Sequence, residues 1–334
     1  MDTLVLWQAR TMPEPASFIG RRVSLRHRID DDPHATTDVV GRVLDADLAR
    51  LVLERRDGSV VTVETSEVVA LRVVPDRPRR SRPAGSVSPE ELTRIASRGW
   101  PATTSTTLGE WELRAAGGFT GRANSVAVTG DPGVPLDEAL GRVVAFYRDH
   151  DLPARAQVVV GSSWEERFAE AGWGPGRTRL SGAVVQTTDL TAAQVQPPEH
   201  PVDVDPSPDD AWLDLYERVD DRGLARAVLE APPTVGFASI REAGRTVAVG
   251  RVVVTGSWVG IAAMQTRPQD LRRGLARSVL RACLAWAHER GATAAYLQTT
   301  SGNDPALALY TSFGFRTHHA YRYLEPGGDR SVRG

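Results

Sequence analysis

The first part of the chain alternates hydrophobic and polar residues in short runs. Alternation with a period of two is typical of half-buried β-strands. It occurs at residues 22–26, 39–44, 51–54 and 60–63. Asp57 and Gly58 lie between the last two runs and favour a hairpin turn. The polar run from Asp30 to His34 predicts an exposed loop. The pattern therefore predicts a small β-barrel or sheet over residues 17–75.

This predicted domain is similar to a Src-homology-3-like barrel. The resemblance implies a docking module for a protein partner or peptide. A packing domain with no ligand of its own is the alternative, and the sequence does not decide between the two.

Beyond the barrel the apolar segments are longer. Some have the residue spacing of helices and others that of strands. Residues 90–190 predict a block with helices at 136–147 and 163–171 around a strand at 154–160. Residues 209–326 predict a second block, which opens with a helix capped by Asp209 or Asp210 and continues with strands at 236–242 and 245–255. Segments rich in proline, arginine or glycine separate and follow the blocks: an Arg/Pro linker at 76–89, a Pro-rich linker at 191–208 and a tail at 327–334.

One turn in the second block carries the candidate chemistry. The apolar run 258–264 predicts a strand, and Leu275, Val279, Cys283 and Trp286 then recur at near-helical spacing. The turn between them reads Leu271-Arg272-Arg273-Gly274-Leu275-Ala276. A helix N-terminus has unpaired N–H groups and the positive end of the helix dipole, and Gly274 lets an anion approach the backbone. The turn is therefore a candidate phosphate site.

The turn resembles the pyrophosphate loop of the GNAT superfamily of acyl-CoA N-acetyltransferases, Gln/Arg-x-x-Gly-x-Gly/Ala. Gly274 and Ala276 match, whereas Leu271 stands where Gln or Arg is usual. A second signature follows in the order and at the spacing of the family, with a strand at 294–299 between the two: Asn303, then Ala-Leu-Ala-Leu-Tyr ending at Tyr310, then Gly314-Phe315. The resemblance implies an α/β (α+β) GNAT fold, whose central mixed, mostly antiparallel sheet is flanked by helices.

The resemblance also implies acetyl-CoA as co-substrate and assigns the residues that bind it. The implied cofactor-binding residues are Met264, Gln265, Thr266, Arg272, Arg273, Gly274, Leu275, Ala276, Arg277 and Asn303. The backbone at 264–266 would pair with pantetheine amides and supply an oxyanion donor. The Asn303 amide would bond the pantetheine arm, or cap a helix, or do both.

Tyr310 is the predicted catalytic acid, because the family often uses this tyrosine to protonate the leaving thiolate. A tyrosine that merely packs between helix and sheet is the alternative. Many members of the family have a glutamate base near the position of Gln265. The amide side chain of Gln265 cannot accept a proton in this way. The remaining candidates for the base are a water relay or one of four carboxylates: Glu217, Asp220, Asp221 and Glu230.

Residues 90–190 resemble a degenerate GNAT-like half. Residues 167–173 align by pattern with 309–315, which places Phe168 opposite Tyr310 without its hydroxyl. Asp131 lies where the Arg/Gly turn is expected and would repel phosphate. We therefore expect a tandem repeat in which this half is structural and not catalytic.

Composition narrows the remaining function classes. The 334 residues carry a net charge of −2, and the arginines of 76–89 have no interleaved aromatic residues, so we do not expect nucleic-acid binding. The chain has no lysine and one cysteine, Cys283, which we expect to be a buried small hydrophobe. We expect no membrane span, no signal peptide and a cytoplasmic protein.

No metal is expected either. His318 and His319 are adjacent on a predicted strand, so their side chains should point to opposite faces and should not chelate one ion.

The sequence thus predicts an acetyl-CoA-dependent N-acetyltransferase. It would transfer an acetyl group to a primary amine, on a small molecule or a protein lysine, by direct attack in a ternary complex. The acceptor is unknown, and the barrel is a possible site for a protein partner. A non-catalytic acyl-CoA-binding sensor and an interaction protein are the alternatives.

Overall fold

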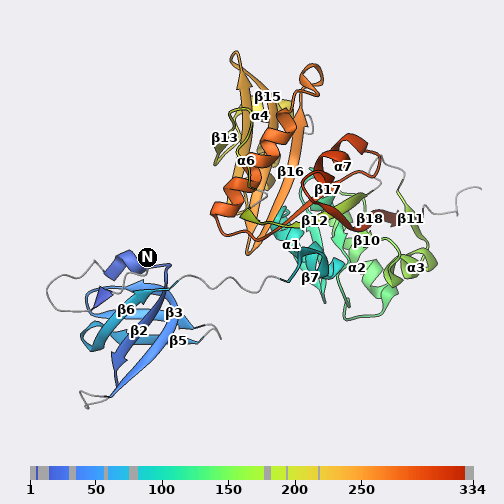
Figure 1. Cartoon of the computed structure of the whole chain (residues 1–334). Helices are drawn as coiled ribbons and strands as arrows, with labels where there is room; N and C mark the ends of the chain where they lie inside the picture. Colours follow the sequence, from blue (N-terminus) through green and yellow to red (C-terminus); the bar gives the residue numbers. More distant parts are fainter. Residues whose placement is uncertain are drawn as a thin grey trace, which may run out of the picture. The chain divides into compact units, whose positions relative to one another are not determined.

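The computed structural model describes residues 5–6, 15–29, 35–55, 59–74, 82–176, 182–192, 195–216 and 219–327. The predicted turn at Asp57-Gly58, the loop from Asp30 to His34, residues 76–81 of the Arg/Pro linker and nearly all of the tail lie outside these ranges. The chain forms two compact units, residues 1–80 and 81–334, drawn in blue and in cyan to red in Figure 1. No helix in the described ranges is long and apolar enough to cross a membrane.

The first unit is a six-stranded antiparallel sheet in the order β1-β6-β2-β3-β4-β5. Its strands are β1 (Val5–Leu6), β2 (Arg22–Arg28), β3 (Thr36–Ala46), β4 (Arg50–Arg55), β5 (Val60–Glu64) and β6 (Val68–Val73). Val23 and Leu25 alternate with polar residues and are fully buried, as are Leu51 and Leu53. The alternation therefore predicted both the strands and the face that forms the core of this small barrel-like domain.

The second unit is built on one continuous sheet, with helices α1 to α7. The strand order is β13-β14-β15-β16-β17-β12-β18-β10-β9-β8-β7, and β11 pairs with β18. The strands are β7 (Thr104–Leu108), β8 (Trp111–Ala115), β9 (Val126–Ala127), β10 (Ala156–Val159), β11 (Trp173–Pro175), β12 (Ala183–Asp189), β13 (Asp203–Asp205), β14 (Val235–Glu242), β15 (Arg245–Thr255), β16 (Trp258–Thr266), β17 (Ala294–Thr299) and β18 (Arg316–Pro326). The helices are α1 (Pro89–Gly99), α2 (Leu136–Asp149), α3 (Ser163–Glu170), α4 (Asp210–Leu215), α5 (Arg222–Leu229), α6 (Leu275–Glu289) and α7 (Asp304–Thr311).

The two halves of this unit exchange strands. β12 is the last strand of the first half in sequence but pairs with β17 and β18 of the second half. β18 in turn continues past β12 to pair with β10 and β11 of the first half. Each half therefore completes the sheet of the other.

Helices cover both faces of the second half (Figure 1). Ala238 and Ala248 pack with α6 in one core cluster, whereas their sequence neighbours Phe237 and Val249 pack with α4 and α5 in another. Adjacent strand residues point to opposite faces, so the two helix layers lie on opposite sides of the sheet. Asp209 caps α4, accepting the Trp212 N–H at 2.7 Å, as the sequence indicated.

The first half has an aromatic core. Trp111 contacts the rings of Trp164 and Phe168 at centroid distances of 5.2 and 5.6 Å, and Phe168 contacts Trp173 at 5.3 Å. Phe168, the predicted counterpart of Tyr310, is fully buried in this cluster. Large rings therefore fill the interior around this position.

Candidate active site

The Arg/Gly turn joins the end of β16 to α6. After the 3₁₀ turn Pro268–Asp270, Arg272 has φ 59° and Gly274 has φ 82°, while Gly274 is the N-cap of α6. Arg272 and Gly274 have left-handed backbone conformations, and Arg273 between them does not. Such a turn can form a concavity lined by backbone N–H groups, which is a typical anion-binding site. The N–H groups of Leu275, Ala276 and Arg277 lie in the first helical turn, where no intrahelical carbonyl can accept them. The strand, turn and helix that the sequence predicted are all present.

The three predicted phosphate-binding arginines have different surroundings. Arg273 is held by two carboxylates, with Nη1 2.8 Å from Asp270 Oδ1 and Nη2 2.9 Å from both oxygens of Glu242. These contacts raise the pKa of Arg273, with the Glu242 hydrogen bond as the largest cause. Its side chain therefore stabilises the turn, because its donors already face carboxylates.

Arg272 and Arg277 are better placed to meet a ligand. Arg272 is exposed beside Gly274, on a left-handed backbone. Arg277 is half-buried, with its guanidinium carbon 5.4 Å from the centre of the Phe313 ring. Positive charge at the turn thus comes from these two side chains and from the helix terminus.

β16 and β17 separate just before the turn. They pair in parallel from Trp258↔Ala294 to Ile261↔Leu297, and no pair in the described register joins them beyond that point. On its other side β16 has a bulge, because Val249 pairs with Gln265 whereas Arg251 pairs with Ala262. Ala263 at the bulge has φ 52°. The backbone after Ile261, including Met264, Gln265 and Thr266, therefore has polar groups on the β17 side without a strand partner.

Tyr310 lies in the core between α6, α7 and the sheet. Its side chain is only 6% exposed and packs with Phe315 at a ring distance of 6.1 Å. Burial, and then the neighbouring Cys283, raise the pKa of Tyr310 to about 12. Burial also raises the pKa of the Cys283 thiol to about 12. Cys283 is fully buried, as the sequence predicted.

Asn303 is the N-cap of α7. Its Oδ1 accepts the Ala306 N–H at 3.3 Å, and the residue is exposed. One of its two proposed roles, the helix cap, is therefore present. The Nδ2 donors lie at the exposed end of the helix.

The predicted candidates for the base occupy ordinary structural positions where the structure describes them. Asp221 caps α5 by accepting the Leu224 N–H at 3.0 Å, and Glu230 pairs with Arg226 at 3.1 Å. Asp220 is exposed. Glu217 lies outside the described residues.

The two adjacent histidines do not point to opposite faces, so that prediction was wrong. The register between β12 and β18 shifts after Val185↔His319, which makes a bulge at His318. The Nδ1 atoms of His318 and His319 consequently lie 2.7 Å apart, and His318 Nε2 lies 2.8 Å from the Val87 carbonyl oxygen. Within the described ranges, no three or more His, Cys, Asp or Glu side chains are placed to hold a metal ion together.

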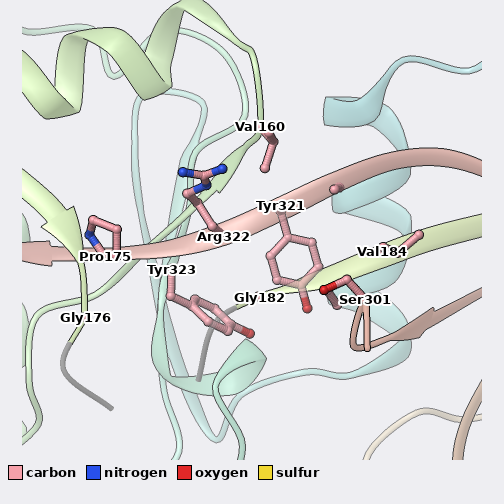
Figure 2. A pocket seen from close by; sticks show the side chains of 11 residues that line it. Val160, Pro175, Gly176, Gly182, Val184, Ser301, Tyr321, Arg322 and Tyr323 are labelled. Atoms are coloured by element: carbon pink, nitrogen blue, oxygen red, sulfur yellow. The ribbon is translucent and has the colours of Figure 1, made fainter. Parts of the chain in front are cut away.

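A pocket of about 380 Å³ lies where β18 passes from β12 to β10. Figure 2 shows Tyr321 and Ser301 on one side of it and Arg322 on another. Tyr321 donates its hydroxyl to Gln298 Oε1 at 2.9 Å, which connects this pocket to the end of β17. Among its described lining residues Arg322 is the one charged side chain, so the pocket offers no carboxylate to a cationic ligand.

Comparison with known families is consistent with this geometry. The family described as "Probable histone acetyltransferase Rv0428c C-terminal" matches residues 90–324, and "Rv0428c N-terminal Sm-like domain" matches residues 17–72. The chain belongs to the Rv0428c family of GNAT acetyltransferases. The first match spans both halves of the continuous sheet, and the second agrees with the predicted small barrel.

Relatives named in this comparison are acetyltransferases. The probable histone acetyltransferase Rv0428c of Mycobacterium tuberculosis is 30% identical over 318 residues, covering 92% of this chain and 95% of the relative. The uncharacterized N-acetyltransferase YobR of Bacillus subtilis is 24% identical over 250 residues, covering 70% of this chain and 97% of YobR. The solved GCN5-related N-acetyltransferase from Kribbella flavida shares the fold, with a TM-score of 0.53, 18% identity and coverage of 73% of this chain and 97% of that one. The Rv0428c-family chain is thus a GNAT-type N-acetyltransferase, which favours the enzyme over the two non-catalytic alternatives.

Sequence reasoning missed two features of the site. The bulge at Ala263 has no distinctive residue type, although two successive alanines in a strand of larger apolar residues are a weak indication. Glu199 and His200, in the Pro-rich segment predicted to be a linker, lie against Gly274: an added Cβ there would be 3.6 Å from Glu199 Oε2 and 3.9 Å from His200 Nε2. In the same segment Asp203–Asp205 form the edge strand β13.

Proposed function

We propose that this chain transfers an acetyl group from acetyl-CoA to a primary amine by direct attack within a ternary complex. The observation that carries the proposal is the separation of β16 from β17 after Ile261↔Leu297, directly before the anion-binding turn. If the thioester of acetyl-CoA lay in this gap, the phosphates of the same molecule would lie at the N-terminus of α6.

The residues present suit acetyl-CoA. The left-handed Arg272 and Gly274 and the first turn of α6 would hold the pyrophosphate, with charge from Arg272 and Arg277. Backbone groups of residues 264–266, free of β17, would bond the pantetheine amides and supply the oxyanion donor. Asn303 Nδ2 would contact the same arm. When bound, acetyl-CoA supplies an acetyl group activated as a thioester.

Tyr310 is proposed as the acid, holding a proton at Oη for the departing sulfur. A free thiol has a pKa of about 8.5, so a phenol with a pKa of about 12 would be a poor donor to a thiolate in water. A leaving thiolate held in a site less polar than water would also have a raised pKa, which would make the proton transfer feasible.

Water is proposed to remove the proton of the amine. The described carboxylates that could serve as the base are exposed or engaged in a helix cap and an ion pair. Holding the amine against the thioester can by itself account for much of the rate enhancement. No dedicated carboxylate base is then required.

A protein lysine is the first acceptor class to test, because the Mycobacterium tuberculosis relative is named a probable histone acetyltransferase. Small amines are the second class. The absence of lysine from this chain makes the assay unambiguous, since any acetyl-lysine formed must come from the acceptor.

The test is thiol release from acetyl-CoA in the presence of a lysine-bearing histone-tail peptide, a polyamine or an aminoglycoside. We expect amine-dependent release and an acetylated product by mass spectrometry with at least one class. Binding of acetyl-CoA without turnover on any of the three would contradict the proposed acceptor range, and failure to bind acetyl-CoA would contradict the proposal as a whole.

A further inference from the structure

The segment before β13 contacts the first two turns of α6. Arg281 of α6 holds it, with Nη1 2.9 Å from Glu199 Oε1 and 3.4 Å from the Pro197 carbonyl oxygen, and Nη2 3.1 Å from Gln196 Oε1. The Arg281 side chain is only 15% exposed, whereas the Glu199 side chain that it meets is 58% exposed. The segment is therefore fixed to the helix that carries the anion-binding turn.

His200 connects this segment to the turn itself. Its Nε2 lies 3.0 Å from the Arg273 carbonyl oxygen, and its backbone N–H donates to Ser278 Oγ at 3.2 Å. A carbonyl oxygen can only accept, so His200 Nε2 carries the proton in this contact. The bonded carbonyl belongs to the residue between the two left-handed residues, Arg272 and Gly274.

A hydrogen bond to that carbonyl also orients an N–H group. The peptide unit between Arg273 and Gly274 is planar and trans, so its C=O and N–H point in opposite directions. While His200 holds the carbonyl oxygen on one side, the Gly274 N–H is directed to the other side of the turn. The contact therefore sets the direction of a donor in the anion-binding concavity.

We propose that His200 is a positioning residue for the phosphate-binding turn, acting through the Arg273–Gly274 peptide. This inference rests on the proposed function of the turn. Pro197, Pro198 and Pro201 restrict the backbone on both sides of His200 and keep its ring in place. Arg281 pairs with Glu199 at 2.9 Å and so offsets the negative charge that the segment brings near the turn.

The test compares three variants of the full chain by calorimetry with acetyl-CoA and by steady-state kinetics. His200→Ala removes the ring donor, and His200→Gln keeps an N–H donor on a side chain of similar reach. His150→Ala is the matched control, because His150 Nδ1 makes a similar 2.7 Å contact with the Phe146 carbonyl oxygen at the end of α2 in the first half.

For His200→Ala we expect the Kd and KM for acetyl-CoA to rise about fivefold, the size of one hydrogen bond. The kcat at saturating acetyl-CoA and the KM for the amine should stay at the wild-type values. His200→Gln should recover most of the affinity, and His150→Ala should not change it.

Wild-type affinity in His200→Ala would overturn the inference, as would equal losses in the alanine and glutamine variants. A fall in kcat with unchanged KM for acetyl-CoA would also overturn it. If the wild-type chain bound no acetyl-CoA, the proposed function would fail first, so the two failures can be told apart.

Discussion

The Cys283 thiol and the Tyr310 phenol lie in one buried cluster, and each has a pKa of about 12. Both shifts come mainly from burial, which disfavours the charged form of either group. Both groups are therefore protonated in this core near neutral pH. A protonated phenol is the form that the proposed role of Tyr310 as the acid requires.

Tyr310→Phe should lower kcat about 100-fold while leaving the Kd for acetyl-CoA unchanged, since it removes only the hydroxyl of the proposed acid. Stopped assays with saturating acetyl-CoA and calorimetry give the two numbers. Unchanged turnover with every acceptor would contradict the acid assignment. Cys283→Ala is the control for the core, and it should keep the activity.

Gly274→Glu should weaken acetyl-CoA binding more than about 100-fold. The substitution strains a left-handed position, φ 82°, and puts a carboxylate where phosphate is expected. Gly291→Glu is the matched control, because Gly291 has φ 83° just after α6 and an added Cβ there meets no atom within 4 Å. Equal affinity in the two variants would show that the turn is not the phosphate site.

Arg272→Gln should mainly weaken acetyl-CoA binding, whereas Arg273→Gln should mainly lower stability. Arg272 is exposed at the turn, so its loss should raise the Kd for acetyl-CoA about threefold to tenfold, and less at high salt. Arg273 is bound to Asp270 and Glu242, so its loss should lower the melting temperature and affect the Kd indirectly. Calorimetry at two salt concentrations and thermal melts separate the effects, and a larger Kd change in Arg273→Gln would contradict the assignment.

The histidine pair predicts a pH dependence of stability. Burial, and then His318, lower the pKa of His319 to about 4, whereas an unfolded histidine titrates near 6.5. The unfolded chain thus binds more protons between these values, so stability is fully present above about pH 6.5 and falls as the pH drops toward 4. At about 1.4 kcal/mol per pKa unit, the loss of unfolding free energy over this range should approach about 3 kcal/mol.

Urea unfolding at pH 4.5 and 7.5 measures this loss. His319→Leu removes the titrating group, so the difference in unfolding free energy between the two pH values should shrink. An unchanged difference would contradict the role of the pair. His27→Leu, on β2 in the other compact unit, is a control for the general effect of losing a histidine.

The strand, turn and helix around Gly274 were predictable, because the features that indicate them lie close together in the sequence. These features are the glycine, the spacing of the apolar residues and the arginines. The same holds for the barrel strands, whose alternation marks a buried face. The strand exchange through β12 and β18 was not predictable, since it depends on pairing between residues more than 100 positions apart, such as Val185 and Gln298. Bulges at Ala263 and His318 likewise arise from register between strands.

The side-chain partners of the site were also beyond local patterns. Arg273 matched the expected phosphate ligands by type and position, but Glu242 on β14 lies close enough to engage it. No sequence pattern marked His200 as a residue that contacts the turn. Its contact depends on where β13 begins relative to α6, which the Pro-rich segment does not indicate. Residue types indicated which side chains could bind phosphate, whereas the fold determined which of them are already bound to other side chains.

We propose that the second half, and not the first, binds acetyl-CoA at the Gly274 turn. Calorimetric titration of the full chain with acetyl-CoA tests it most directly. We predict one molecule bound per chain with a micromolar Kd. No binding, or two molecules bound per chain, would contradict this proposal.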